Sequence, residues 1–224
     1  MERDKRPSIG KERDKKQFRR RDQSYASIDL SDSVIYVLDF LPQGGSIRSS
    51  RHGPPHSTIY ALGVTTLNIL EIHFKEGTIS TGAPEKLNLQ KHKSNITRIR
   101  RISYEILTSE AKSELPAILD ELVDDEEKRF VEFFNNAYPI TNRLHQLRLL
   151  PGIGETRMWD ILNARKKAPF ESYQDLKDRA KISNPQRLIS TRILQELECD
   201  EKHYLFVRKK RERTDDHSSS RRSF

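Results

Sequence analysis

LLPGIGET, residues 149–156, is the stretch that decides how the C-terminal half of this 224-residue sequence is expected to fold. Apolar residues three apart precede its glycines, and a second apolar periodicity follows them and stops at Pro169. These patterns predict a helix on each side of a tight turn. The apolar residues of the first predicted helix are Leu144, Leu147 and Leu150, and those of the second are Met158, Ile161 and Leu162.

The turn itself has the chemistry of a phosphate site. Gly152 and Gly154 permit a tight bend whose backbone N–H groups point outward at the positive end of the next helix, while Ile153 would point inward. Such a main-chain site suits a phosphate and ignores base sequence. Glu155 opposes an anion, whereas the Thr156 hydroxyl can donate to one. The segment resembles the helix-hairpin-helix motif of DNA- and RNA-binding proteins; the alternative is a purely structural turn.

Charge is concentrated around this motif. The chain carries a net charge of +8, but residues 25–207 sum to −1, because the two ends together carry +9. Within that middle, residues 141–195 carry +6, next to −7 in residues 105–140. The local field, rather than the total, therefore indicates an anionic partner. The nucleic-acid-binding residues predicted here are Gly152, Ile153, Gly154, Thr156, Arg157, Arg148, Lys166 and Lys167.

A degenerate second copy of the motif is expected next, giving a tandem domain over residues 141–200. Residues 169–179 look like the connector between such copies, and KISNP at 181–185 stands where the second glycine turn would be. Without glycines this turn would complete the packing and bind phosphate weakly, if at all. Trp159 and Met158 are expected in the core rather than as platforms for base stacking.

The N-terminal half is expected to be a small β-barrel over residues 31–104. Strands are predicted at 34–41, 58–64, 66–75, 85–89 and 96–100, with a long loop at 43–57. Leu67 and Ile69 have one apolar parity and Leu70, Ile72 and Phe74 the other, and this switch predicts a bulge. Five short strands in this length suit a barrel of the OB or S1 type. Arg98 and Arg100 would lie on its basic rim, either to bind nucleic acid or to protect an edge strand.

The remaining segments are charged. Residues 105–140 are expected to form acidic connecting helices, and residues 201–207 a short terminal strand. Residues 1–30 and 208–224 read as disordered basic arms, which either clamp phosphates or solubilise the chain. No apolar run approaches the roughly 20 residues of a membrane span, and no secretory signal is apparent, so a cytoplasmic location is expected. The single Cys199 excludes an internal disulfide.

Several stretches together are similar to an archaeal family known as domain of unknown function 655. The resemblance implies an archaeal source, RNA binding with a loose tie to ribosomal RNA maturation, and an S1/OB-like barrel followed by helix-hairpin-helix, but no known activity. The arms and the 43–57 loop depart from it. The stretches that carry the resemblance are YVLDFLP (36–42), ISY (102–104), LT (107–108), ELP (114–116), FVEFFNNA (130–137) and RLHQL (143–147).

The fold class expected is therefore α+β and multidomain, with a small OB/S1-like barrel, an all-α helix-hairpin-helix domain and basic tails. The expected function is noncatalytic binding of nucleic acid, with RNA (rRNA or tRNA) as partner and no cofactor. DNA binding in repair or recombination is one alternative, and a ribosome- or protein-docking adaptor is another. Asp175 and Asp178 stand where some DNA glycosylases of this class carry a catalytic aspartate, but the chain lacks their larger bundle. His52 and His56 are too few for a metal site.

Overall fold

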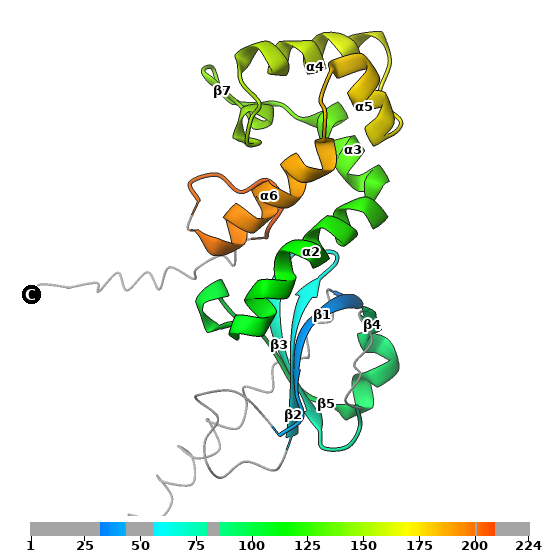
Figure 1. Cartoon of the computed structure of the whole chain (residues 1–224), viewed down its shortest axis with the longest axis vertical. Helices are drawn as coiled ribbons and strands as arrows, with labels where there is room; N and C mark the ends of the chain where they lie inside the picture. The colour runs from blue at the N-terminus through cyan, green and yellow to red at the C-terminus, as the bar shows by residue number, and fades with distance from the viewer. Residues whose placement is uncertain (1–31, 44–55, 80–85, 200, 209–224) are drawn as a thin grey trace, which may run out of the picture.

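The computed structural model describes residues 32–43, 56–79, 86–199 and 201–208. Apart from Arg208, the two predicted basic arms lie outside the described residues, as does most of the predicted 43–57 loop. The molecule is a mixed α+β structure with a β-sheet at one end and the helices α4 (Glu155–Lys167) and α5 (Tyr173–Ala180) at the other (Figure 1). Helix α2 (Ser109–Asp125) lies between the two ends.

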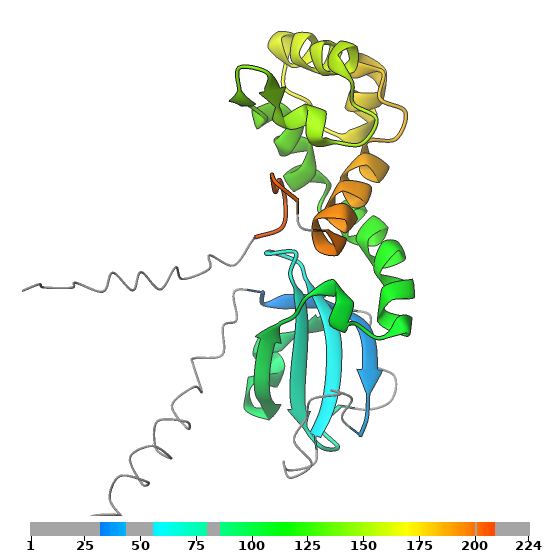
Figure 2. The same cartoon turned by 90° about the vertical axis from the view of Figure 1, so that its left-hand side faces the viewer.

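A five-stranded antiparallel sheet forms the first end. Its strands are β1 (Val34–Leu41), β2 (His56–Gly63), β3 (Ile69–Lys75), β4 (Lys86–Asn88) and β5 (Ile96–Arg101), in the order β4-β1-β2-β3-β5. Within the described residues β4 and β5 remain separate edges, so the sheet is open where a closed barrel was predicted. The 3-10 helix η2 (Leu89–Asn95) connects these edges and buries Leu89 against one face of the sheet. Figure 2 shows the strands side by side with their twist.

The predicted strand over residues 66–75 starts later than expected. β3 begins at Ile69, and Leu67 adopts a left-handed backbone with φ 54° in the preceding turn. That turn is held by the Asp32 carboxylate, which accepts the N–H groups of Thr65 and Thr66 at 2.8 Å. The parity switch between Ile69 and Leu70 falls at the start of β3, where the pairing with β2 is in continuous register, so it does not mark a bulge. The observed register shifts lie between Val37 and Asp39 in β1 and between His73 and Phe74 in β3.

Two helices follow, as the sequence predicts for residues 105–140. They are α2 (Ser109–Asp125) and α3 (Glu127–Asn136), after a short 3-10 turn η3 (Tyr104–Ile106). The Thr108 hydroxyl accepts the N–H of Ala111 at 3.1 Å and donates to Asp39 of β1 at 2.6 Å, which fixes the start of α2 against the sheet. The apolar side of α2 is fully used in packing; its buried residues are Ala111, Leu115, Leu119, Leu122 and Val123.

The helix predicted before the glycines does not form. Its place is taken by a small hairpin, β6 (Pro139–Thr141) and β7 (Leu144–His145), and by the 3-10 helix η4 (Gln146–Leu149). The Thr141 hydroxyl holds the hairpin turn, accepting the N–H groups of Arg143 and Leu144 at 3.3 and 3.1 Å. Apolar residues spaced by three suit a helix of three residues per turn, which explains η4. The helices α4 (Glu155–Lys167), α5 (Tyr173–Ala180) and α6 (Pro185–Glu198) complete this end.

Residues 201–208 form bends rather than the short terminal strand predicted for 201–207. The N–H groups of residues 205–207 donate to the side chain of Glu196 in α6 and not to a neighbouring strand. The Phe206 ring packs edge-on against Phe130 and Phe133 of α3, with centroids 5.7 and 4.9 Å away. Arg208 N–H donates to Thr66 O at 3.3 Å. This segment therefore joins the helices to the sheet.

Two clusters of buried apolar residues hold the fold. The smaller one lies between the sheet and η2, around Ile35, Ile72 and Phe74. The larger runs without a break from the other face of the sheet through α2 and α3 to α4, α5 and α6. A continuous core of this kind fixes the helices relative to the sheet. No helix in the described part of the chain is long and apolar enough to cross a bilayer.

Candidate nucleic-acid interface

The glycine turn at residues 152–154 is open to solvent. Gly152 has φ +80°, in the left-handed region, and a Cβ added there or at Gly154 would have nothing within 4 Å. Ile153 is buried, and its N–H donates to Leu150 O at 3.1 Å. As predicted, the isoleucine anchors the turn while the two glycines face outward.

Helix α4 begins directly at this turn. Gly154 is its N-cap, with φ −81° and ψ −177°, and its carbonyl accepts the N–H of Met158 at 3.0 Å. Because glycine has no side chain to cap the helix, the first N–H groups of α4 face outward with the positive end of the helix dipole behind them. Glu155 and Thr156 are both exposed in this first turn. The arrangement can hold a phosphate, with Glu155 limiting the affinity.

Two of the predicted cations lie next to the turn, and two do not. Arg148 in η4 and Arg157 in α4 are exposed, and Nη1 of Arg157 lies 3.4 Å from Lys181 O in the next turn along the chain. Lys166 and Lys167 are at the other end of α4, about 18 Å away at 1.5 Å per residue. They cannot contact the same phosphate as the glycine turn. There they interact favourably with the negative end of the helix dipole.

The turn before α6, at residues 181–184, shares the left-handed backbone of the glycine turn at its first residue although it contains no glycine. Lys181 has φ 56°, in the same left-handed region as Gly152, and Ile182 is buried as Ile153 is. The Asn184 side chain then caps α6 by accepting the N–H of Arg187 at 3.1 Å. A capped helix start is less available to a ligand. This supports the prediction that the second copy binds phosphate weakly.

Strand β5, which carries Arg98 and Arg100, lies at the opposite end of the molecule from α4 (Figure 1). Arg98 is exposed on β5. Arg100 is ion-paired: its Nε donates to the buried Glu71 carboxylate at 2.8 Å, and His73 Nε2 lies 2.6 Å from the other oxygen. Burial raises the pKa of Glu71, but the hydrogen bonds from His73 and Arg100 outweigh it and hold the pKa below its usual value. The charge of Arg100 is thus already balanced within the sheet.

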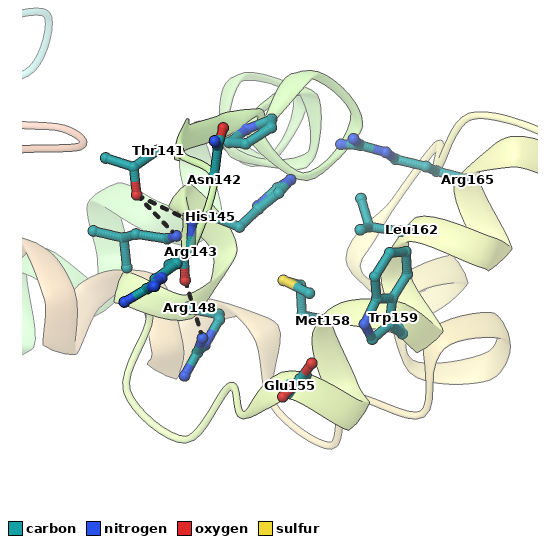
Figure 3. A pocket seen from close by; sticks show the side chains of 12 residues that line it. Thr141, Asn142, Arg143, His145, Arg148, Glu155, Met158, Trp159, Leu162 and Arg165 are labelled. Carbon is teal, nitrogen blue, oxygen red and sulfur yellow. Dashed lines mark hydrogen bonds between the residues drawn. The ribbon is translucent and has the colours of Figure 1, made fainter.

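A pocket of about 550 Å³ opens between α4 and the β6–β7 hairpin (Figure 3). Trp159, which was predicted in the core, lines it with 49% of its surface exposed, whereas Met158 is buried as predicted. His145 lies across from α4 and is buried; burial, with a smaller contribution from Arg165, lowers its pKa. The full lining is Pro139, Thr141, Asn142, Arg143, Leu144, His145, Arg148, Glu155, Met158, Trp159, Leu162 and Arg165.

The residues weighed for catalysis have structural roles here. Asp175 Oδ2 accepts from Arg179 Nη1 at 2.7 Å and from Glu171 N–H at 3.2 Å at the start of α5. Asp178 accepts from Gln174 at 2.9 Å. His52 lies outside the described residues, and the ring of His56 stacks on His73 at 4.5 Å. Among described residues, no three His, Cys, Asp or Glu side chains gather as metal ligands would.

The comparisons agree with this architecture. Residues 31–208 match the model of a family described as "Protein of unknown function (DUF655)". The chain belongs to the DUF655 family. An uncharacterized protein of Methanocaldococcus jannaschii is 38% identical over 184 residues, which cover 80% of this chain and 82% of the relative. A crystal structure of the DUF655 protein Af1531 from Archaeoglobus fulgidus superposes with a TM-score of 0.64 at 35% identity, covering 79% of this chain and 99% of Af1531.

DUF655 membership confirms the family and the archaeal relatives that the sequence suggested. The family match covers both the sheet and the helices, because the matched residues run from before β1 to the end of the 201–208 segment. The names of these DUF655 relatives state no activity.

Proposed function

We propose that this DUF655 protein is a noncatalytic nucleic-acid-binding protein that holds a backbone phosphate of RNA at the Gly152–Thr156 turn. The observation that carries the proposal is the open left-handed glycine turn at the uncapped start of α4. Outward N–H groups at a helix N-terminus bind phosphate oxygens without reading base sequence. Arg148 and Arg157 would strengthen the contact by adding positive charge next to the turn.

In this proposal the turn acts as a divergent helix-hairpin-helix unit, with the short 3-10 helix η4 before it and α4 after it. Helix α6 with its capped turn completes the packing. The five-stranded sheet would be a divergent, open relative of the S1/OB barrels, with the exposed Arg98 on a second contact surface. RNA, ribosomal or transfer, is the proposed ligand. DNA is the alternative that the turn alone does not discriminate against, because main-chain N–H groups contact neither base nor 2′-OH.

The adaptor alternative depends on the acidic helices and is less well supported. The apolar side of α2 is buried against the sheet and α6. Two of its acids are engaged within the chain: Asp120 accepts from Arg187 at 2.7 Å, and Asp125 pairs with Lys86 and accepts from Tyr36. A docking partner would therefore have only the remaining charged surface of these helices to contact.

Substitution of Gly154 tests the proposal sharply. Its φ and ψ suit an N-cap residue, and its Cβ position is free, so Asp or Asn can be introduced without strain. Gly154→Asp should cap α4 and leave stability equal or slightly higher, while its carboxylate repels a phosphate. Gly154→Asn provides the matched control, because it caps the same N–H groups without charge.

The measurement is RNA affinity by fluorescence anisotropy over a salt series, with thermal unfolding of each variant. We expect affinity to fall in the order wild type, Gly154→Asn, Gly154→Asp, with roughly a ten-fold loss or more for the aspartate. Lys166→Ala with Lys167→Ala, far from the turn, should have a smaller effect. Wild-type affinity in Gly154→Asp would contradict phosphate binding at this turn. Tighter binding of a DNA of the same sequence would favour the DNA alternative.

A further inference from the structure

We propose that the pocket between α4 and the β6–β7 hairpin receives one unpaired base of the bound strand, stacked on Trp159. The inference rests on the proposed function, since it specifies which part of the nucleic acid enters a site next to the phosphate-binding turn. It also specifies the kind of RNA: at this position the strand is single.

The exposure of Trp159 is the first observation. Tryptophan has a large apolar surface that folded chains normally bury for the most part, yet about half of this side chain is open to solvent. It lies in the pocket on the α4 side with Leu162, and His145 and Arg148 lie on the other side (Figure 3). An exposed indole in a pocket is a surface on which any base can stack.

The charge of the pocket is the second observation. Three guanidinium groups line it, those of Arg143, Arg148 and Arg165, against the single carboxylate of Glu155. Arg165 is fixed in place, because its Nη1 donates to the carbonyls of Phe134 and Asn135 at 2.9 Å each. A nucleotide supplies both an aromatic face for the indole and negative charge for the arginines. An apolar peptide side chain would match the indole alone.

The continuity with the turn is the third observation. Glu155 is the first residue of α4 and also lines the pocket, so the two sites share the start of this helix. From Gly154 to Trp159 the helix rises about 7.5 Å, at 1.5 Å per residue. A strand with one phosphate at the turn therefore passes the mouth of the pocket. Glu155, which opposes a phosphate, can instead accept a hydrogen bond from an amino group of a base.

The test uses the fluorescence of Trp159, which is the only tryptophan of the chain. The probe is a single-stranded RNA of about twelve nucleotides of mixed sequence, compared with the same RNA annealed to its complement. We expect the single strand to quench the tryptophan emission at saturation and the duplex to leave it largely unchanged. Trp159→Ala should bind the single strand about ten-fold more weakly.

Two further variants separate stacking from folding. Trp159→Phe keeps an aromatic ring and should stay within about three-fold of wild-type affinity. Ile106→Ala removes a side chain of the same 49% exposure from η3, outside the pocket, and should bind as wild type does. Circular dichroism of all variants checks that the helices are retained.

The outcomes distinguish this inference from the proposed function. If Gly154→Asp weakens RNA binding but Trp159→Ala does not, and no quenching is seen, the pocket inference is wrong and the phosphate site stands. Equal quenching by the duplex would also overturn it, because a paired base cannot stack on the indole. If the wild-type chain binds neither RNA, the proposed function fails first.

Discussion

Arg192 and Glu196 lie one turn apart on α6 and form a buried ion pair, with 3.0 Å between Nε and Oε1. The carboxylate of Glu196 also accepts the backbone N–H groups of Leu205, Phe206 and Val207 at 2.7, 3.0 and 2.9 Å. Nη2 of Arg192 donates to the carbonyl of His203 as well. This buried pair of α6 thus holds the 201–208 segment against the helix.

Replacement of Glu196 by alanine should therefore destabilise the fold strongly. The change would leave the Arg192 charge buried without its main partner and three N–H groups unsatisfied, a loss of about 3–5 kcal/mol in the free energy of unfolding. Urea denaturation followed by circular dichroism measures it. Glu121→Ala, which removes an exposed carboxylate from α2, should change stability by less than about 0.5 kcal/mol. Similar values for the two variants would contradict the role given to Glu196.

Gly152→Ala should destabilise the protein through the backbone alone. Its φ of +80° is costly for any residue with a Cβ, although the space around the position is free. We expect a loss of about 1–2 kcal/mol. Thermal unfolding checks this, with Gly154→Asn as the comparison, because position 154 has an ordinary φ and should tolerate the change. Equal stability of Gly152→Ala and wild type would show that the turn relaxes to another conformation.

Lys181→Gly should stabilise the protein, whereas Gly152→Ala destabilises it. Lys181 adopts φ 56° at the place equivalent to Gly152, so glycine relieves a strained backbone there. After the entropy cost of glycine, the net gain should be at most about 1 kcal/mol. Denaturant unfolding measures the midpoint, which should rise. A fall in the midpoint would mean that the lysine side chain contributes more than its backbone strain costs.

Protonation of His145 should weaken the fold below neutral pH. Its Nδ1 accepts the N–H of Leu147 at 3.1 Å, which requires an unprotonated nitrogen, and burial lowers its pKa in the folded state. The unfolded chain then binds the proton more readily, near its ordinary pKa of about 6.5. Stability from this residue is complete above pH 6.5 and declines as the pH falls below it.

The measurement is the free energy of unfolding between about pH 5 and 7.5. His145→Gln removes the titrating group and should show a flatter profile than wild type over this window, although its absolute stability is lower. The difference between the two profiles isolates the histidine from the carboxylates. Parallel profiles would refute the assignment.

Much of the local structure could be predicted from the sequence. The strand 34–41 and the acidic helices of residues 105–140 were anticipated from β-branched content and apolar spacing. Ile153 faced inward, as the two flanking glycines indicated. The leucines at 144, 147 and 150 were ambiguous, because spacing by three fits a 3-10 turn as well as one face of a short helix. The hairpin that replaced the predicted helix depended on the Thr141 hydroxyl, which no periodicity reveals.

By itself the sequence determined the chemistry of the candidate phosphate site. A glycine turn before an amphipathic helix depends only on the local backbone, and such local structure can be predicted from a single sequence. Only the tertiary structure decided which charges from other elements accompany that turn: it kept Arg148 of η4 near it and paired Arg100 with Glu71. The places of Arg157 at the start of α4 and of Lys166 and Lys167 at its far end follow from the helix alone. It also left Trp159 facing a pocket instead of the core, because the neighbour across α4 is a hairpin and not a helix. Such outcomes depend on contacts between residues distant in sequence, which periodicity does not encode.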